Sequence, residues 1–402
     1  RRAASRRAGL LGFLGKEIGV VLAANFISVA ARMSLVTFLG IYFVREAGIA
    51  LATVGAAFFC ENLLRGLLAP FFGALSDRLG RRPLILCASL LTAAVLPCFL
   101  LVHGPLSLFG WSLAMGVAGA VTMPVASALL LDLAPVDRRQ SVLALNYTVV
   151  SVAYTLAVTP AGYVAERGYG LLAALSAGSY LLVPALYLFG LRGPLPIERA
   201  SSGEESLYKA FASVFQDKVL LAFAAIAFVF PFSMGLVVYA SPLFAVDRGL
   251  GEGFIGLVLG LNSVIVALFA VPVATRMEHA GPFRWLGAAA LVVSAALACF
   301  GGLPHAGAAF VAGTVVFSFA ELVFSSAVPA AVARLAPPGR RGAYQGAWTL
   351  VSSVSMGSAL FVSGLLRDAT GWTGAWILYA ALAFVASVLL VLTRERFLRA
   401  GA

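Results

Sequence analysis

The sequence predicts an all-α membrane protein in which twelve transmembrane helices form two pseudo-symmetric bundles of six. Two observations predict this class. Hydrophobic residues make up 61% of the chain and charged residues 11%, with a mean hydropathy of +0.98, whereas soluble domains carry about 25% charged residues. A short basic turn also recurs halfway along the chain, which indicates a repeated architecture.

The apolar residues lie in long runs, which predict membrane-spanning helices. A helix needs about 20 apolar residues to cross the hydrocarbon core of a bilayer. The runs are apolar throughout and lack the alternation of barrel strands, so the helix is the expected spanning unit. We predict twelve spans, at residues 18–44, 50–76, 83–103, 105–133, 140–165, 169–191, 219–246, 252–277, 283–302, 306–334, 342–366 and 371–393.

One polar stretch separates the first six spans from the last six. It runs from Gly193 to Asp217 and is rich in Pro, Ser, Gly and Glu, the composition of a linker. We therefore predict a first bundle at residues 1–192, a cytoplasmic linker at 193–218 and a second bundle at 219–402.

The linker ends in an amphipathic segment, ESLYKAFASVFQDK. In a helix, Leu207, Phe211 and Phe215 share one face, while Lys209 and Lys218 can remain hydrated beside lipid headgroups. This pattern predicts a short helix on the membrane surface. A helix that binds a partner protein is the alternative.

Basic residues gather on one side of the predicted topology. The termini, the turns after even-numbered helices and the linker hold 22 of the 28 Lys and Arg residues. The positive-inside rule then places both termini in the cytoplasm. Arg outnumbers Lys by 25 to 3, which favours a bacterial inner membrane as the location. Because the net charge of +11 follows from topology, we predict no nucleic-acid partner.

Two pairs of turns recur at almost the same offset. LAPVDRR (133–139) and LAPPGRR (335–341) lie 202 positions apart, after the fourth and tenth predicted helices. GALSDRLGRRP (73–83) and ATRMEHAGPFR (274–284) match at an offset of 201, after the second and eighth helices. Matches in equivalent turns predict two parallel halves related by an axis along the membrane normal, an architecture of secondary transporters.

GALSDRLGRRP resembles the signature turn of the major facilitator superfamily, G-x-L-x-D-R-x-G-R-R, and the twelve-span pattern extends the resemblance to the whole chain. The resemblance implies that Asp77 meets helix 11 near Gly342 and that Arg81 meets Asp132, which would close the cytoplasmic side in the outward-facing state. Gly73 leaves room for another helix to approach. The additional arginines also fit plain membrane anchoring. The predicted gating residues are Gly73, Asp77, Arg78, Gly80, Arg81, Arg82 and Asp132.

Four ionisable residues lie near the middle of predicted spans: Arg32, Glu61, Arg65 and Glu321. Each costs at least about 2.5 kcal/mol at the bilayer centre. Their charges sum to zero, so we expect them to pair in the interior. Glu61 and Arg65 are four residues apart on one helix face and can bridge directly. Arg32 and Glu321 then remain as the other two, one from each half.

Glu321 is the predicted proton-coupling residue. Poor solvation favours the neutral form of a carboxyl group, which can then load and release a proton near physiological pH. FAELVFSSAVPAAVARLAPPGRRGAYQG resembles helix 10 and the following turn of twelve-helix drug:proton antiporters, and the resemblance implies that Glu321 couples protonation to efflux. A static ion pair is the alternative. Glu61 is a second coupling candidate, although it can simply neutralise Arg65.

Helix 5 departs from the drug-antiporter pattern. In VLALNY, Asn146 stands where some relatives carry Asp, and an amide cannot titrate. VTPAGYVAE retains only Pro160 and Gly162 of a signature with Gly-Pro and paired glycines. These departures bear on the direction of antiport more than on the fold.

Polar and aromatic side chains within apolar spans are candidate walls of a substrate cavity. As a set, aromatic rings around a carboxylate suit a lipophilic cation, through cation–π contact and charge pairing. For any single aromatic residue, ordinary packing is the alternative. Pro231 and Pro242 interrupt helix 7 and permit it to bend. The candidates are Asn25, Ser28, Asn62, Asn146, Tyr147, Ser151, Tyr154, Phe230, Tyr239, Asn262 and Trp348.

The sequence thus predicts proton-coupled efflux of lipophilic, cationic small molecules by alternating access. Arg32 and Arg65 support an alternative, a carrier or flippase of a lipid or anionic metabolite. No HExxH, GxSxG or Walker-type pattern is present, which argues against an enzyme, and short tails argue against a receptor. The predicted partners are the substrate and the bilayer; the proton is the coupling ion, with no other cofactor and no metal. The resemblance implies a monomer.

Overall fold

The computed structural model describes residues 15–135, 138–191, 214–278, 282–337 and 340–400 of the 402-residue chain. Every regular element within these ranges is helical, so the predicted all-α class is confirmed. Most of the predicted surface helix in the linker lies outside the described residues. The division into residues 1–192, 193–218 and 219–402 therefore stays a prediction.

Six spans occupy the first part of the chain, within a few residues of their predicted bounds. Three of them end in tighter or wider turns that continue the helix, the π-helical turns η1 and η4 and the 3₁₀ turn η2. The elements are α2 (Lys16–Ile41) with η1 (Tyr42–Glu46), α3 (Leu51–Leu79), α4 (Arg81–Val95) with η2 (Leu96–Leu101), α5 (Pro105–Leu133), α6 (Arg139–Ala165), and the series α7 (Tyr169–Tyr180), α8 (Leu182–Ala185) and η4 (Leu186–Gly190).

The seventh span is interrupted, and proline explains the break. Pro231 has no N–H to donate to the carbonyl of Ala227, the last residue of the first segment. Pro242 lies in the first turn of the last segment, where a missing N–H costs little. The interruption predicted from the two prolines is confirmed. The segments are α10 (Lys218–Ala227), α11 (Val229–Gly235), η5 (Leu236–Ala240) and α12 (Ser241–Asp247).

The last five spans form four continuous elements, because the eleventh and twelfth spans both belong to α16 and are separated only by a sharp turn. Gly371 has φ 69° and ψ 173°, a conformation that glycine adopts at little cost. Eleven described helices are long and apolar enough to cross a membrane, and dividing the last one at Gly371 gives the twelve predicted spans. The elements are α13 (Glu252–Glu278), α14 (Pro282–Gly302), α15 (Ala306–Leu335) and α16 (Arg341–Ala400).

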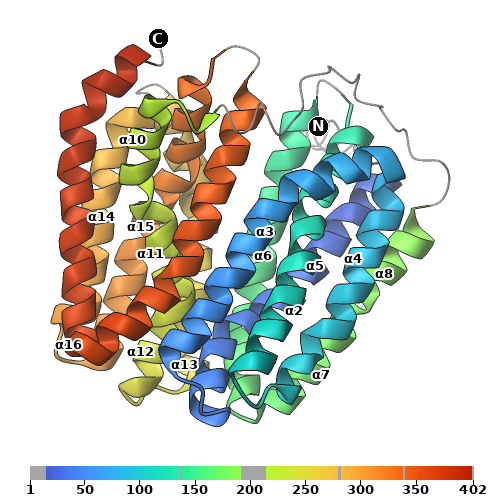
Figure 1. The fold of residues 1–402 in the computed structure, drawn as a ribbon, viewed down its shortest axis with the longest axis horizontal. Helices are drawn as coiled ribbons and strands as arrows, with labels where there is room; N and C mark the ends of the chain where they lie inside the picture. Colours follow the sequence, from blue (N-terminus) through green and yellow to red (C-terminus); the bar gives the residue numbers. More distant parts are fainter. Residues whose placement is uncertain (1–14, 136–137, 192–213, 279–281, 338–339, 401–402) are drawn as a thin grey trace, which may run out of the picture.

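The first six spans and the last six lie side by side, on the right and left of Figure 1. Two pairs of helices make the most extensive contacts between them: α3 packs against α16, and α6 packs against α13. In order along the chain these are spans 2 and 11, and spans 5 and 8. In two equivalent halves, span 2 corresponds to span 8 and span 5 to span 11. The two pairs are therefore equivalent, as a twofold relation between the two sets requires.

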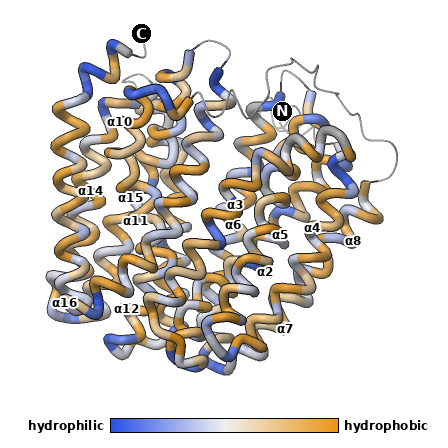
Figure 2. The backbone as a smooth tube through the Cα atoms, in the orientation of Figure 1, coloured by the Kyte–Doolittle hydropathy of each residue, from blue (hydrophilic) through white to orange (hydrophobic). Residues whose placement is uncertain are grey.

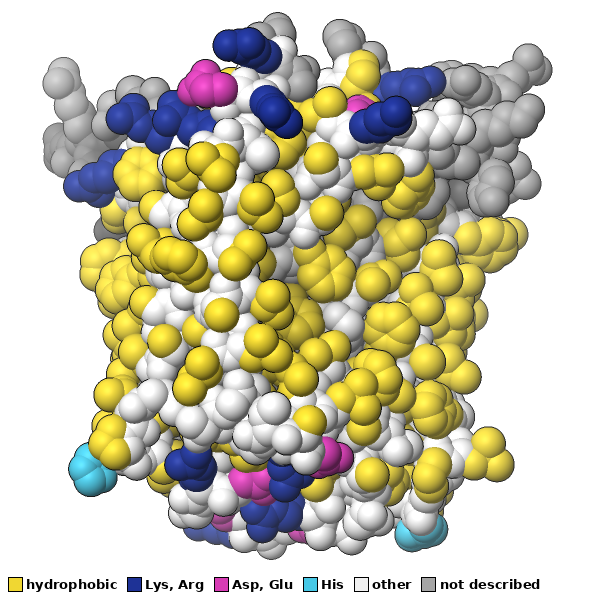
Figure 3. Space-filling view, turned by 60° about the vertical axis from the view of Figure 1, so that its left-hand side comes forward, with side chains coloured by type: hydrophobic (Ala, Val, Ile, Leu, Met, Phe, Trp, Pro, Cys, Tyr) yellow, Lys and Arg dark blue, Asp and Glu magenta, His cyan; other side chains and the backbone are white. Residues whose placement is uncertain are grey.

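The surface has the polarity of a membrane protein. Polar segments gather at the two ends of the helices, and the middle of the molecule is mostly apolar (Figure 2). Figure 3 shows the same division on one face, where yellow apolar side chains form the central band and charged side chains lie near the top and bottom. A multi-pass membrane protein follows from the length and polarity of these helices.

Among the described residues, the closest backbone contacts between the two sets of helices lie at one end of the molecule. We name the end that carries Arg341 and Ala400 the terminal end, and the opposite end, which carries Asp247 and Gly371, the far end (Figure 1). At the far end, a Cβ on Gly55 would overlap the backbone of Phe361, and one on Gly364 would overlap Ala52. Here α3 and α16 are therefore in backbone contact.

We name the two interfaces, α3 with α16 and α6 with α13, the seams. The seam between α6 and α13 is also in backbone contact at the far end. A Cβ on Gly162 of α6 would overlap the carbonyl of Glu252 at the start of α13. At the terminal end, in contrast, no atom of the described residues lies within 4 Å of the Cβ positions of Gly73 or Gly342. The close approach of a helix to Gly73 is therefore not observed in this conformation, because the molecule is closed at the far end.

Candidate functional site

Glu321 lies in the interior of the molecule, at the middle of α15. Only 9% of the residue is exposed, so it does not face lipid. The amide nitrogen of Asn262, on α13, donates to Oε2 of Glu321 at 3.1 Å and to Oγ of Ser318 at 2.9 Å. One neutral donor therefore holds the carboxyl group.

Two tyrosines of α6 bring the first six spans to this carboxyl group. Tyr147 lies close to Ser325 of α15 and interacts electrostatically with Glu321. Tyr154, two turns further along the same face of α6, lies near Thr37 and also interacts electrostatically with Glu321. Glu321 thus sits where the two sets of helices meet. Tyr147 is 52% exposed, so the approach to this site is open beside the tyrosine.

The ion pairing in the first six spans differs from the prediction. Glu61 does not bridge to Arg65; its Oε1 lies 2.9 Å from Nη2 of Arg32 in a mostly buried ion pair. Arg65 instead donates to Asn62 and lies close to Tyr239 of η5. The expected pairing of Arg32 with Glu321 is therefore wrong as well.

A glycine explains why the arginines can share this region. Gly119 of α5 has no side chain, and a Cβ there would lie 3.1 Å from Cδ of Arg65 and 3.9 Å from Nη1 of Arg32. Both guanidinium stems thus pass over the same backbone, and Arg32 is brought within reach of Glu61. Spacing along a single helix does not reveal such a contact.

The charges consequently divide unequally between the two sets of spans. Arg32 and Glu61 neutralise each other, and Arg65 donates to the neutral amide of Asn62. Across the described residues, Glu321 has no Lys, Arg or His within 4 Å, and its recorded partner is an amide. The chemistry that this leaves open is the binding of a proton or of another cation at Glu321.

The remaining cavity candidates fall into different environments. Asn25 donates to Asn146 at 2.7 Å, which joins α2 to α6, and Ser28 donates to the hydroxyl of Tyr180. Ser151 donates to the carbonyl of Tyr147. Two aromatic candidates lie in packed clusters of the last six spans: Phe230 is fully buried and stacks on Phe324, and Trp348 packs against Phe223.

The signature turn is built around Gly80, whose φ of 89° ends α3 and starts α4. Arg81 pairs with Asp132 at the end of α5, as the resemblance implied, and also donates to Ser76. Arg82 donates to the carbonyl of Leu188. These partners all belong to the first six spans, so this bridge does not join the two sets. The side chains of Asp77 and Arg78 lie outside the described residues, and the contact between Asp77 and helix 11 stays a prediction.

A capping interaction joins two helices at the terminal end. Oδ1 of Asp217 accepts the backbone N–H groups of Val219 and Leu220, at 2.8 Å and 3.2 Å, at the start of α10, and Oδ2 accepts the hydroxyl of Tyr344 on α16. Partial burial raises the pKa of Asp217, but the three hydrogen bonds outweigh it, and the pKa is lowered from its usual value. This carboxylate therefore stabilises the start of α10.

Sequence reasoning missed a charged cluster at the far end. Asp247 accepts Nη2 of Arg45 at 2.7 Å, Nη2 of Arg367 at 2.9 Å and the indole N–H of Trp372 at 2.8 Å. Nearby, the hydroxyl of Tyr169 donates to Glu252 at 2.8 Å. The Arg45–Asp247 and Tyr169–Glu252 contacts connect the first six spans to the last six. The available signal was that Arg45 and Arg367 lie outside the basic side of the topology.

Comparison with known families decides the assignment. The model of the Major Facilitator Superfamily matches residues 21–309 and 226–401, which together cover almost the whole chain. The chain belongs to the Major Facilitator Superfamily. It is a membrane transporter and not an enzyme. Among the described residues of this superfamily member, no group of three or more His, Cys, Asp or Glu side chains is placed to hold a metal ion.

Similar proteins are transporters of several kinds. The superfamily member is 26% identical over 393 residues to a Na⁺, Li⁺, K⁺/H⁺ antiporter of Planococcus maritimus, a match that covers 89% of this chain and 90% of the relative. It is 31% identical over 125 residues, 31% of each chain, to the multidrug resistance protein MdtH of Shigella dysenteriae. A POT family transporter solved with a thioalcohol-conjugated peptide has the same fold, with a TM-score of 0.79, 15% identity and coverage of 96% and 98%.

Proposed function

We propose that this transporter exchanges protons for lipophilic, cationic small molecules by alternating access, with Glu321 as the coupling residue. One observation carries the proposal: a buried carboxyl group between the two sets of helices has an amide as its recorded partner and no basic side chain within 4 Å among the described residues. A site of this kind favours either a bound proton or a bound cation, and competition between them couples the two fluxes.

The closed far end supports the alternating-access part of the proposal. The two seams and the Arg45–Asp247 contact occlude that end, while at the terminal end no described atom lies within 4 Å of the Cβ positions of Gly73 or Gly342. We further propose that the terminal end is cytoplasmic, in a bacterial inner membrane, because 22 of the 28 basic residues belong to that side. The conformation is then inward-facing.

The role of Glu61 is better explained as structural. Its carboxylate forms a mostly buried ion pair with Arg32, and removal of one partner would leave an uncompensated charge. We therefore assign proton coupling to Glu321 alone and treat Glu61 as the fixed counter-charge of Arg32.

Two other substrates have specific support. The relative from Planococcus, similar along most of its length, is named as an antiporter of Na⁺, Li⁺ and K⁺ with H⁺, and a small metal cation can also compete with a proton at Glu321. Arg65, hydrogen-bonded but without a carboxylate partner among the described contacts, supports a carrier of a lipid or an anionic metabolite.

The test is transport in proteoliposomes under an imposed pH gradient. The panel contains a lipophilic cationic dye, Na⁺, K⁺ and an anionic lipid analogue, and each is measured with the wild type and with Glu321→Gln. We expect proton-driven movement of the dye, lost in Glu321→Gln and retained in Glu395→Gln, a matched change at an exposed residue near the end of α16. Full dye transport by Glu321→Gln removes this residue from the mechanism. Transport of only the metal ions or only the anion selects the corresponding alternative.

A further inference from the structure

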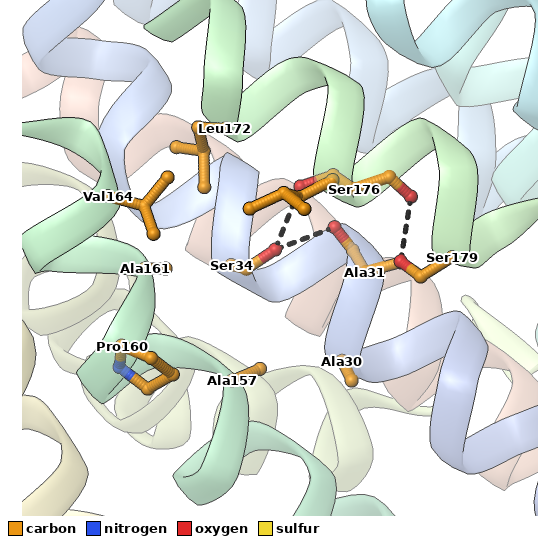
Figure 4. A pocket seen from close by; sticks show the side chains of 11 residues that line it. Ala30, Ala31, Ser34, Ala157, Pro160, Ala161, Val164, Leu172, Ser176 and Ser179 are labelled. Carbon is orange, nitrogen blue, oxygen red and sulfur yellow. Dashed lines mark hydrogen bonds between the residues drawn. The ribbon is translucent and has the colours of Figure 1, made fainter. Parts of the chain in front are cut away.

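A cavity of about 210 Å³ lies between α2, α6 and α7, away from Glu321 (Figure 4). Small side chains create it: Ala30 and Ala31 of α2 and Ala157 and Ala161 of α6 leave space that the larger Leu172 of α7 does not fill. Three serines, Ser34, Ser176 and Ser179, also line the cavity.

The hydroxyl hydrogens of this lining are already donated within the protein. Ser34 donates to the carbonyl of Ala31 at 3.0 Å and lies 3.0 Å from the hydroxyl of Ser176. Ser179 donates to the carbonyl of Ser176 at 3.0 Å. A cavity holds water when two or more polar groups remain to bind it. Since these hydroxyls are engaged and the other lining side chains are apolar, the cavity suits an apolar occupant.

The cavity opens toward the bilayer between α6 and α7. At its edge Leu175 is 54% exposed, and Pro160 across from it on α6 is also exposed. The main packing partners of α7 are α2, α4, α6, α8 and η2, all within the first six spans, and the contact of α7 with Glu252 of α13 is made by its first residue, Tyr169. The exposed side of α7, which includes Leu171, is therefore part of the apolar surface that meets lipid. The cavity is continuous with that surface.

We propose that this cavity binds one acyl chain of a membrane phospholipid, which enters between α6 and α7. A dry, apolar cavity of about 150 Å³ takes up benzene in a soluble protein, and the cavity described here is larger and opens to hydrocarbon. The occupant is the molecule that surrounds the opening. This site is independent of the substrate proposed for Glu321.

The bound chain would support a helix that takes part in the contact between the two sets of spans. On another face of α6, Thr159 donates to the carbonyl of Gly256 at 3.3 Å, and Gly162 lies against Glu252. The cavity residues Ala157 and Ala161 flank these positions on the same helix. An acyl chain packed between α2 and α6 therefore fixes the position from which α6 meets α13.

The experiment uses the full-length protein reconstituted with a phosphatidylethanolamine that carries a photoreactive diazirine in the middle of one acyl chain. After illumination, mass spectrometry locates the adducts. We expect adducts to concentrate on α6 and α7 between residues 157 and 179. Ala161→Phe should lower their yield by roughly an order of magnitude, because the ring occupies the volume that the chain needs. The matched change Ala174→Phe, at an exposed position of α7 outside the cavity, should leave the yield unchanged.

Three results would overturn the proposal. Adducts spread evenly over the apolar surface would indicate ordinary surrounding lipid only. An unchanged yield in a folded Ala161→Phe variant would show that the chain does not enter the cavity, and if that variant does not elute as a single species, Ala157→Leu is judged by the same criterion. Displacement of the adducts by the cationic dye would make the cavity a site for the transported molecule instead.

Discussion

The side-chain amide of Asn262 uses both of its hydrogens at the centre of the protein, one toward Oε2 of Glu321 and one toward Oγ of Ser318. Because Ser318 in turn donates to the carbonyl of Thr314 at 2.9 Å, the orientation of the amide is fixed. The carboxyl group thus faces a rigid neutral donor. Such a donor stabilises a carboxylate without occupying it with a counter-charge.

Asn262→Ala removes this donor and should weaken the binding of a cationic dye. A hydrogen bond to a charged group contributes about 1.5–3 kcal/mol, so we expect the Kd to rise roughly ten-fold or more. Fluorescence titration of purified protein at pH 7 measures the change. Asn25→Ala, which breaks the contact with Asn146, is the control and should leave the Kd near the wild-type value. Equal losses in the two variants would indicate that the amide has no special role.

The Arg32–Glu61 pair should behave as a structural unit. Removal of one partner leaves a buried charge and costs about 3–5 kcal/mol, so Glu61→Leu and Arg32→Leu should each lower the Tm markedly. The double variant should lose less stability than the two single variants lose together. Thermal unfolding in detergent gives the four stabilities. Additive losses would mean that the pair contributes no coupling energy.

Gly162→Ala should disfavour the conformation with the closed far end. The added methyl group overlaps the carbonyl of Glu252, and such overpacking typically costs about 1–3 kcal/mol. Cysteines introduced in place of Arg45 and Arg248 should then react faster with a water-soluble maleimide. Gly170→Ala, which meets no atom within 4 Å, is the control. Unchanged labelling rates in Gly162→Ala would show that this seam does not limit opening.

Asp217 should make the stability of the terminal end depend on pH. The pKa of Asp217 is lowered in the folded protein. Its full contribution to stability is therefore present above the ordinary pKa of about 3.9. This contribution is lost as the pH falls through the lowered value. At pH 7, Asp217→Ala should cost about 1 kcal/mol, as for other N-cap residues. The difference in Tm from the wild type should shrink at pH 3. Asp217→Asn, which retains a cap, should lose less, and a difference that does not vary with pH contradicts the role of the charge.

The spans were predictable because apolar length and turn residues are local properties. All twelve predicted spans are found, most of them within a few residues of their bounds, although the last helix runs to Ala400; the break at Pro231 follows from its missing N–H. The contact between Arg81 and Asp132 followed from the resemblance of one short turn to a known family.

The pairing of the interior charges was not predictable from one chain. Helical spacing favoured Glu61 with Arg65, but the space above Gly119 lets Arg32 reach Glu61, and Asn62 takes Arg65. The far-end cluster around Asp247 depends in the same way on which helix ends meet in space. From the sequence alone, Phe230 and Trp348 could be cavity walls or packing residues. The structure shows that Phe230 stacks on Phe324.

The glycine contacts between α3 and α16 have a consequence for how fast the protein can turn over. Where Gly55 meets Phe361 and Gly364 meets Ala52, the joint is made of backbone surfaces, and within the described parts of these two helices no side-chain hydrogen bond crosses it. Separation of α3 from α16 at this joint loses van der Waals contacts but leaves no hydrogen-bond donor or acceptor unpaired. The activation barrier at this joint should therefore be low, and the slow step of a cycle belongs to the opposite joint, where Tyr169 must release Glu252.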